Sequence, residues 1–79
     1  MQEKRTEMPG RPFDDLNKAV GETVLVKLKG EKTVRGILKA FDVHLNIVLD
    51  QAEELENGEV KIKHSKLMVR GDSIIMIAL

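Results

Sequence analysis

Hydrophobic positions along the chain change their spacing at Gly21. Before it, apolar side chains recur at helical intervals, and Pro12 suits a first helical turn because its missing N–H has no partner there. Gly21 suits the C-cap that ends such a helix. We therefore predict one short amphipathic helix over residues 12–20. The side chains expected to share its apolar side are Phe13, Leu16, Asn17 and Val20.

After Gly21 the pattern has the two-residue period of strands with one buried face. Gly36 interrupts the second of these strands, where a glycine commonly marks a bend or bulge. Val34, Leu38 and Ala40 should share the buried face of that strand. An Asn-Gly pair at 57–58 is a strong hairpin signal. Five strands are predicted, over residues 24–29, 33–42, 46–54, 60–69 and 73–79.

One helix followed by five short, mostly hairpin-linked strands indicates a mainly β domain. A strongly bent, five-stranded antiparallel barrel of the SH3-like or OB-like kind accommodates this pattern economically. We expect this domain to cover residues 12–79. Residues 1–11 are polar and contain Pro-Gly, so a flexible N-terminal arm is expected there.

The last predicted strand is apolar without alternation from Ile74 to Leu79. A strand that is apolar on both faces needs cover on both, and the barrel supplies only one. Exposed hydrophobic edge strands also pair readily with other chains. A chain of 79 residues without cysteine cannot add a disulfide to its small core. Self-association through this edge is therefore expected, although a terminal strand that crosses the core would show the same pattern.

Charge and composition narrow the classes of partner. The formal net charge is zero, which argues against a protein that coats nucleic acid through its overall field. Five acidic and no basic residues lie between Asp50 and Glu59, whereas the flanking segments are basic. This layout permits a basic site on one face, and an ordinary mixed surface would also produce it. No apolar stretch is long enough to span a membrane and no signal-peptide core is present, so a cytoplasmic protein is expected.

Polar side chains are concentrated in two of the predicted connections. Residues 42–46 join the second and third strands, and residues 70–72 join the fourth and fifth. In a five-stranded meander both connections follow even-numbered strands, so they should emerge at the same end. The polar side chains expected to cluster there are Asp42, His44, Asn46, Arg70 and Asp72.

This set of side chains suits recognition of an unpaired base. The His44 ring and the Arg70 guanidinium can stack on the two faces of a base. The Asn46 amide offers a donor and an acceptor, which match the N–H and the adjacent carbonyl of uracil. Asp42 and Asp72 can fix the orientation of their neighbours by accepting hydrogen bonds.

Two segments also resemble the motifs of the Sm-like family. The first Sm motif resembles the region from Gly21 to Glu54, with VRG at 34–36, FDVHLNIVL at 41–49 and acidic residues after it. The second resembles LMVRGDSII at 67–75. The resemblance covers residues 12–79 and is closest to the archaeal Sm-like proteins. The bacterial Hfq branch has a Tyr-Lys-His type second motif that is absent here.

The resemblance implies a homo-oligomeric ring, most often heptameric, joined between the fourth strand of one subunit and the fifth of the next. Such rings bind single-stranded, uridine-rich RNA at the inner rim of the pore and act as scaffolds or chaperones in RNA processing. Carried over to this chain, His44 and Arg70 would stack on the base, and Asn46 would hydrogen-bond its edge. The residues that would shape the pocket are Asp42, Gly71 and Asp72.

Plainer interpretations of the same residues remain open. His44 could be a turn residue without a ligand, and Asp42 and Asn46 are common turn residues that bond their own backbone. His64 is expected to be a surface residue outside any site. An alternative function is a protein-interaction barrel that assembles through edge strands, with RNA binding incidental.

Catalysis has little support in the sequence. Asp42 and His44 could form an acid–base pair, but the chain has no cysteine, no nucleophile elbow and no phosphate-binding glycine loop. Two histidines 20 positions apart make a poor metal site. We expect a protein that is not an enzyme and uses no cofactor or metal.

Overall fold

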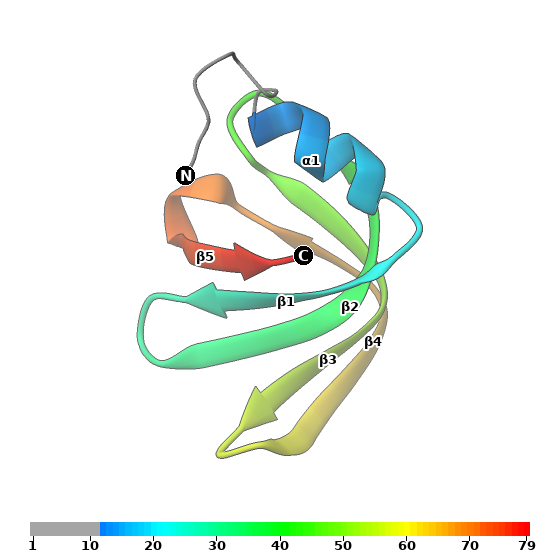
Figure 1. The fold of residues 1–79 in the computed structure, drawn as a ribbon. Coiled ribbons are helices and arrows are strands. Elements are labelled where there is room, and N and C mark those ends of the chain that lie inside the picture. The colour runs from blue at the N-terminus through cyan, green and yellow to red at the C-terminus, as the bar shows by residue number, and fades with distance from the viewer. Residues whose placement is uncertain (1–11) are drawn as a thin grey trace, which may run out of the picture.

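A computed structural model describes residues 12–79, and the predicted N-terminal arm at 1–11 lies outside the described residues. One helix precedes five strands, as the hydrophobic pattern predicts (Figure 1). The elements are α1 (Pro12–Ala19), β1 (Thr23–Leu28), β2 (Lys32–Phe41), β3 (Ile47–Glu56), β4 (Glu59–Val69), a short 3-10 helix (Gly71–Ser73) and β5 (Ile74–Ala78).

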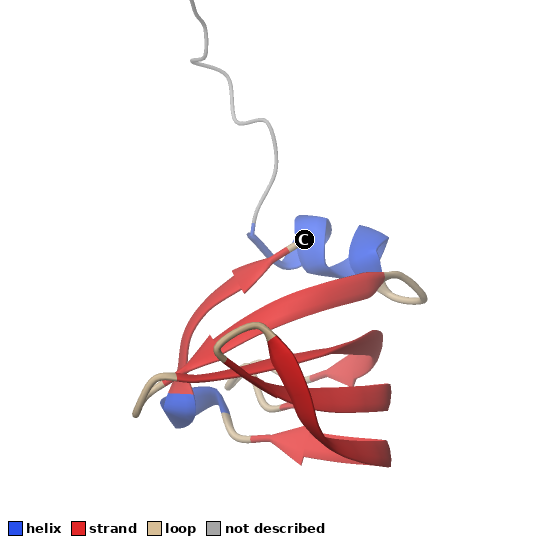
Figure 2. Cartoon of the chain, turned by 90° about the horizontal axis from the view of Figure 1, so that it is seen from below, coloured by secondary structure: helices blue, strands red, loops and turns tan. Residues whose placement is uncertain are grey.

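The strands form a single antiparallel sheet in the order β4-β3-β2-β1-β5. The expected meander is therefore wrong for the last strand, because β5 does not pair with β4. It crosses the barrel and pairs with β1, where Ile77 lies opposite Val26. The sheet curls strongly, and α1 lies across one end of it (Figures 1 and 2). In the part of the chain that the structure describes, β4 and β5 are the two edges of the sheet.

The bend in β2 occurs at Gly36, as predicted. A Cβ at this position would lie 3.1 Å from the Leu49 Cβ and 3.2 Å from the Ala52 Cα, so the two strands approach closely where no side chain intervenes. The β2–β3 register shifts at this point and again between Leu38 and Ala40. The second shift changes the alternation of buried and exposed side chains along β2. Ala40 is therefore exposed, although we expected it to be buried.

The core fills the concave side of the curled sheet and the space beneath α1. Its buried side chains are Leu16, Ala19, Val24, Val26, Val34, Leu38, Ile47, Leu49, Ala52 and Val69. The predicted apolar side of the helix is partly wrong, because Phe13 and Val20 are exposed and only Leu16 and Ala19 are buried. A helix that crosses the end of a sheet buries only a narrow stripe. Phe13 instead stacks on Phe41, with ring centroids 5.9 Å apart.

The β3–β4 hairpin has the two-residue turn that Asn-Gly predicts. Asn57 and Gly58 both have positive φ angles, 54° and 81°. Two such residues are typical of a type I′ turn, whose twist matches that of the flanking strands. This turn sets the register of the first β3–β4 pairs, and an irregularity between Glu54 and Leu55 then shifts it by one residue.

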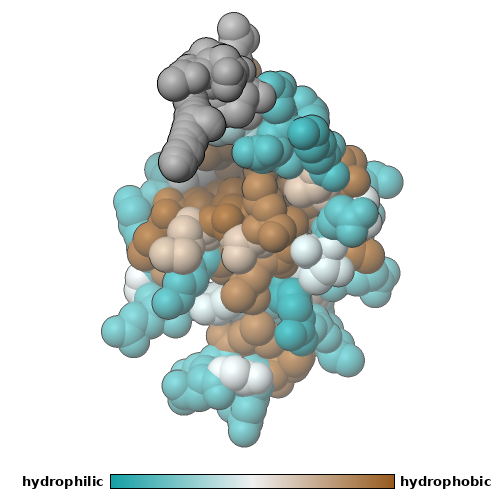
Figure 3. All heavy atoms as spheres, viewed as in Figure 1, coloured by the Kyte–Doolittle hydropathy of each residue, from teal (hydrophilic) through white to brown (hydrophobic). Residues whose placement is uncertain are grey.

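Large apolar side chains are exposed along both edge strands. Met68 on β4 is 67% exposed and Ile75 on β5 is 60% exposed. Val60 and Ile62 on β4 and Met76 on β5 are exposed as well. Figure 3 shows hydrophobic surface down the middle of the molecule, from below α1 towards the β3–β4 hairpin. The expectation of an uncovered apolar edge at the C-terminal strand is confirmed, and β4 provides a second one.

Candidate nucleic-acid interface

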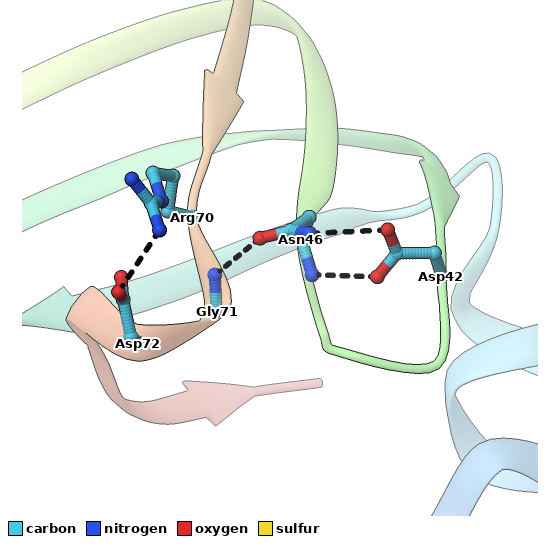
Figure 4. Close-up of polar contacts among 5 residues, drawn as sticks. All are labelled: Asp42, Asn46, Arg70, Gly71 and Asp72. Carbon is cyan, nitrogen blue, oxygen red and sulfur yellow. Dashed lines mark hydrogen bonds and ion pairs between the residues drawn. The ribbon is translucent and has the colours of Figure 1, made fainter.

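The pairing of β3 with β4 brings the two predicted polar connections together. Ile47, the first residue of β3, lies opposite Val69, the last residue of β4. Asn46 therefore lies beside the 3-10 helix that follows β4, and its Oδ1 accepts a 2.8 Å hydrogen bond from the Gly71 N–H (Figure 4). The two connections meet as expected, and they do so without the predicted pairing of the fourth and fifth strands.

Asp42 organises the β2–β3 connection. Its Oδ1 accepts hydrogen bonds from the backbone N–H groups of His44 and Asn46, at 2.9 and 3.1 Å. The Asp42 N–H and carbonyl also bond within the connection, to the Asn46 carbonyl and the Leu45 N–H. Leu45 has a positive φ of 62°, which non-glycine residues seldom adopt, and this network holds it there. Asp42 thus has the local turn role of the plainer interpretation.

The Asp42 carboxylate also holds the side chain of Asn46. Its Oδ2 accepts a 3.1 Å hydrogen bond from the Asn46 Nδ2, next to the Oδ1 that caps the turn (Figure 4). This side-chain hydrogen bond is the main reason that the pKa of Asp42 lies below its ordinary value, and the backbone hydrogen bonds act in the same direction. Asp42 is therefore ionised at neutral pH and acts purely as an acceptor.

Five of the six predicted site residues line one open hollow of about 530 Å³. His44 and Arg70 are exposed at it, while Asn46 and Gly71 are partly buried. Arg70 donates from Nη2 to Oδ2 of Asp72 at 3.2 Å, so the guanidinium is held next to the hollow. The residues that line the hollow are His44, Asn46, Arg70, Gly71 and Asp72.

Asp42 is the predicted site residue that does not line this hollow. It lies on the other side of Asn46 and lines a separate, mostly apolar hollow between α1 and the β2–β3 connection. Its connection to the hollow at His44 and Arg70 is therefore through the Asn46 amide. We expect its influence on a ligand to be indirect.

Gly71 is required by a close approach of the two connections. A Cβ on Gly71 would overlap the carbonyl oxygen of His44 and lie 2.9 Å from the carbonyl carbon of Leu45. Sequence reasoning placed Gly71 at the site only through the family motif. Neither the left-handed turn at Leu45 nor this backbone contact has a signal in the local sequence.

His64 lies outside this hollow, as expected, but it is half-buried rather than a plain surface residue. Its Nε2 is 2.7 Å from the Oε2 of Glu54, on the neighbouring strand. Among residues 12–79, no three histidine, cysteine, aspartate or glutamate side chains are grouped so that they could hold a metal ion. Within the same residues, no helix has the length and hydropathy needed to cross a membrane.

Comparison with known proteins gives consistent matches over almost the whole domain. The LSM domain family model matches residues 14–79. An snRNP Sm-like protein of Methanosarcina acetivorans is 48% identical over 71 residues, which cover 90% of this chain and 99% of that protein. This agrees with the expected likeness to archaeal Sm-like proteins.

Solved structures show the same fold. The Sm protein of Pyrococcus abyssii, solved in complex with a uridine heptamer, superposes with a TM-score of 0.84 at 39% identity and covers 87% of this chain and 97% of that one. A heptameric Sm protein of P. aerophilum superposes with a TM-score of 0.82 at 38% identity. The match covers 87% of this chain and 92% of that protein's chain. With the bent five-stranded sheet, the helix across its end and both sequence motifs in place, this chain belongs to the LSM domain family.

Proposed function

We propose that this chain is a non-catalytic subunit of an RNA-binding ring that holds single-stranded, uridine-rich RNA at the hollow between residues 42–46 and 70–72. The observation that carries the proposal is the hollow itself. It places a histidine ring, a guanidinium and an asparagine amide around one open space. These groups supply the two kinds of contact that an unstacked base needs, namely stacking on its faces and hydrogen bonds to its edge.

Each residue has a distinct role in this proposal. His44 and Arg70 are exposed and reach the hollow from different connections, which suits stacking on opposite faces of a base. Asn46 is partly buried and held from two sides, so it suits reading the base edge. Asp72 holds the Arg70 guanidinium, and Gly71 lets the two connections approach each other.

The structural neighbours support both the ligand and the assembly. A protein with 39% identity and the same fold was solved with a uridine heptamer, and one with 38% identity was solved as a heptamer. We extend both properties to this chain as part of the proposal. The ring would act as a scaffold or chaperone for uridine-rich RNA in RNA processing, in the cytoplasm.

The edges of the sheet fit a ring joined from β4 of one subunit to β5 of the next. Among residues 12–79 neither strand has a partner on its outer side, and both expose large apolar side chains. Two different edges that pair with each other make a head-to-tail contact, which forms a ring when the rotation closes. A ring repeats the hollow in each subunit, so weak individual contacts with one RNA strand add together.

A second function would use the same edges for another partner. The exposed apolar residues on β4 and β5 would also suit a protein-interaction barrel that accepts a peptide as an added strand. In that case the hollow would have no ligand of its own. RNA binding therefore separates the two functions.

Alanine variants at the hollow test the proposal. His44→Ala, Asn46→Ala and Arg70→Ala should each weaken binding of a short oligouridine, and Asn46→Ala should also reduce the preference for uridine over other bases. Lys29→Ala, at an exposed position on another connection, is the control. It should change binding of all oligonucleotides equally and reduce the salt dependence. If Asn46→Ala kept the full preference for uridine, the base would be recognised elsewhere.

A further inference from the structure

His64 and Glu54 form a polar pair at the margin of the core. The His64 Nε2 lies 2.7 Å from the Glu54 Oε2, diagonally across the β3–β4 ladder. Residues directly opposite each other in an antiparallel ladder point to the same face of the sheet. His64 lies opposite the buried Ala52, and Glu54 lies opposite the buried Val34 of β2, so both members of the pair face the core side. Their side chains are 31% and 27% exposed, so water still reaches both in the isolated chain.

The pair belongs to an edge strand that the proposed ring would cover. On β4, Val60 and Ile62 are exposed on one side of His64 and Met68 on the other. β5, the strand proposed to pair with this edge in the next subunit, has five residues. A strand of that length paired anywhere within residues 60–68 includes position 64 among its partners, because 64 is the middle of that range. The contact would therefore remove water from His64 and from Glu54 beside it.

The covering strand brings no charged side chain to the pair. Residues 74–79 are all apolar, so the partner of Glu54 in the ring is still His64. In the part of the chain that the structure describes, the Glu54 carboxylate forms its ion pair with His64 alone. Each lysine near His64 on β4 lies next to a different carboxylate; these are Lys61 beside Glu59, Lys63 opposite Glu53 and Lys66 beside Asp50. The other charged side chains that line the hollows next to Glu54 are Glu31, Lys32, Glu56 and Arg70.

The net charge of the pair depends on the proton of the imidazole. A histidine side chain changes its charge between about pH 5 and pH 8, whereas a glutamate carboxylate is ionised over most of that range. The pair has no net charge when His64 is protonated, and it is a single negative charge when His64 is neutral. Burying a lone charge in apolar surroundings costs more than burying a hydrogen-bonded pair of opposite charges. Formation of the contact therefore favours the protonated imidazole.

We propose that the contact between β4 of one subunit and β5 of the next takes up a proton at His64, so that the ring is more stable in mildly acidic than in alkaline solution. The inference rests on the proposed head-to-tail ring and adds a pH dependence to it. Glu54 supplies the opposite charge that makes the protonated imidazole acceptable at the contact. The sign follows from linkage, because the state that binds more protons is favoured as the pH falls.

Dissociation of the ring at pH 6 and at pH 8.5 tests this inference. Light scattering on a dilution series, without RNA and at one urea concentration below the unfolding transition, gives the protein concentration at which half of the rings have dissociated. For the unmodified protein, this concentration should rise by about tenfold from pH 6 to pH 8.5, because uptake of one proton at a contact corresponds to at most a tenfold change per pH unit. A concentration that stays the same or falls would overturn the inference.

Two substitutions within the pair should have different effects. His64→Gln removes the titrating group and should abolish the rise. Glu54→Gln leaves a protonated His64 without an opposite charge, so the ring should dissociate more readily at pH 6 than at pH 8.5. This reversal of sign decides the question if His64→Gln does not fold, and circular dichroism shows which variants are folded. His44→Gln removes the other histidine of the chain and should keep the rise.

The outcomes separate this inference from the proposed function. If the unmodified protein forms no ring at either pH, the proposed head-to-tail assembly is wrong and the role of His64 is overturned with it. If the ring forms and the folded variants at His64 and Glu54 keep the same rise as the unmodified protein, only the role of this pair is overturned.

Discussion

Ile47 of β3 and Val69 of β4 lie opposite each other in the sheet, and both are buried. This pair is the last of the β3–β4 ladder, so the chain enters β3 and leaves β4 at the same place. Asn46 and Arg70 are the next residues outward, and the hollow forms between them. The Asn57–Gly58 turn at the other end of the hairpin and the register shift between Glu54 and Leu55 together set this register.

The approach of the two connections predicts a strong effect of Gly71→Ala. The added Cβ would overlap the His44 carbonyl oxygen, so the connections must separate and the Asn46–Gly71 hydrogen bond is lost. We expect destabilisation of about 1–3 kcal/mol and loss of preferential oligouridine binding. Urea unfolding and fluorescence anisotropy measure the two effects.

Gly30→Ala is the control for this substitution. Gly30 has a φ of 81° and open space around it, in a turn at the far end of β1. Its replacement should cost about 1 kcal/mol through backbone strain and leave RNA binding unchanged. Equal RNA binding by both variants would show that the Gly71 contact does not shape the site.

The close approach at Gly36 predicts a defect in the fold rather than in the site. A Cβ here meets the backbone of β3 at 3.2 Å, and a larger side chain would push β2 and β3 apart at the bend. Gly36→Val should lower the free energy of unfolding by about 1–3 kcal/mol. Lys39→Ala, at an exposed position on the same strand, should change it by less than about 0.5 kcal/mol. Similar urea midpoints for the two variants would contradict the close contact.

Assembly through the sheet edges predicts that a charge on β5 breaks the oligomer. Ile75 is 60% exposed in the isolated chain, and Ile75→Lys would bury an unpaired ammonium at an edge contact. Light scattering should show a shift from a ring to smaller species, with an unchanged circular dichroism spectrum. Val43→Lys introduces the same charge at an apolar residue that is 73% exposed and lies off both edges, so it should leave the ring intact. A ring that survived Ile75→Lys would place the contact elsewhere.

The lowered pKa of Asp42 predicts a dependence of stability on pH. A carboxyl whose pKa is lower in the folded state binds fewer protons there, so it stabilises the fold above its ordinary pKa of 3.8 and loses this contribution as the pH falls through the lower, folded value. The unmodified protein should therefore lose more stability than Asp42→Asn between pH 5 and pH 2.5, as measured by urea unfolding. Parallel curves for the two proteins would contradict the hydrogen-bonded role of this carboxylate.

Local patterns predict most of the fold of this chain. The helix, the five strands, the bend at Gly36 and the Asn57–Gly58 turn all have direct signals, because periodicity and turn chemistry act over a few residues. The pairing of β5 with β1 has no such signal, since it depends on how far the sheet curls. The exposure of Phe13 and Ala40 follows from the same long-range geometry.

The candidate site, like the fold, is only partly predictable from the sequence. The residue types at 42–46 and 70–72 indicate base recognition, and the order of the strands indicates that the two connections meet. The direction of the Asp42–Asn46–Gly71 hydrogen bonds could not be read from the sequence, because each residue alone is an ordinary turn residue. The pairing of β3 with β4 brings Asp42, Asn46 and Gly71 together in one hydrogen-bonded network.

The most direct test of this account is fluorescence-anisotropy binding of the unmodified protein to equal-length oligouridine, oligocytidine and oligoadenosine at one moderate salt concentration. We predict a clear preference for oligouridine, with affinity lost on Asn46→Ala. Equal binding of all three, or none, would contradict a uracil site at His44, Asn46 and Arg70 and would favour the protein-interaction barrel.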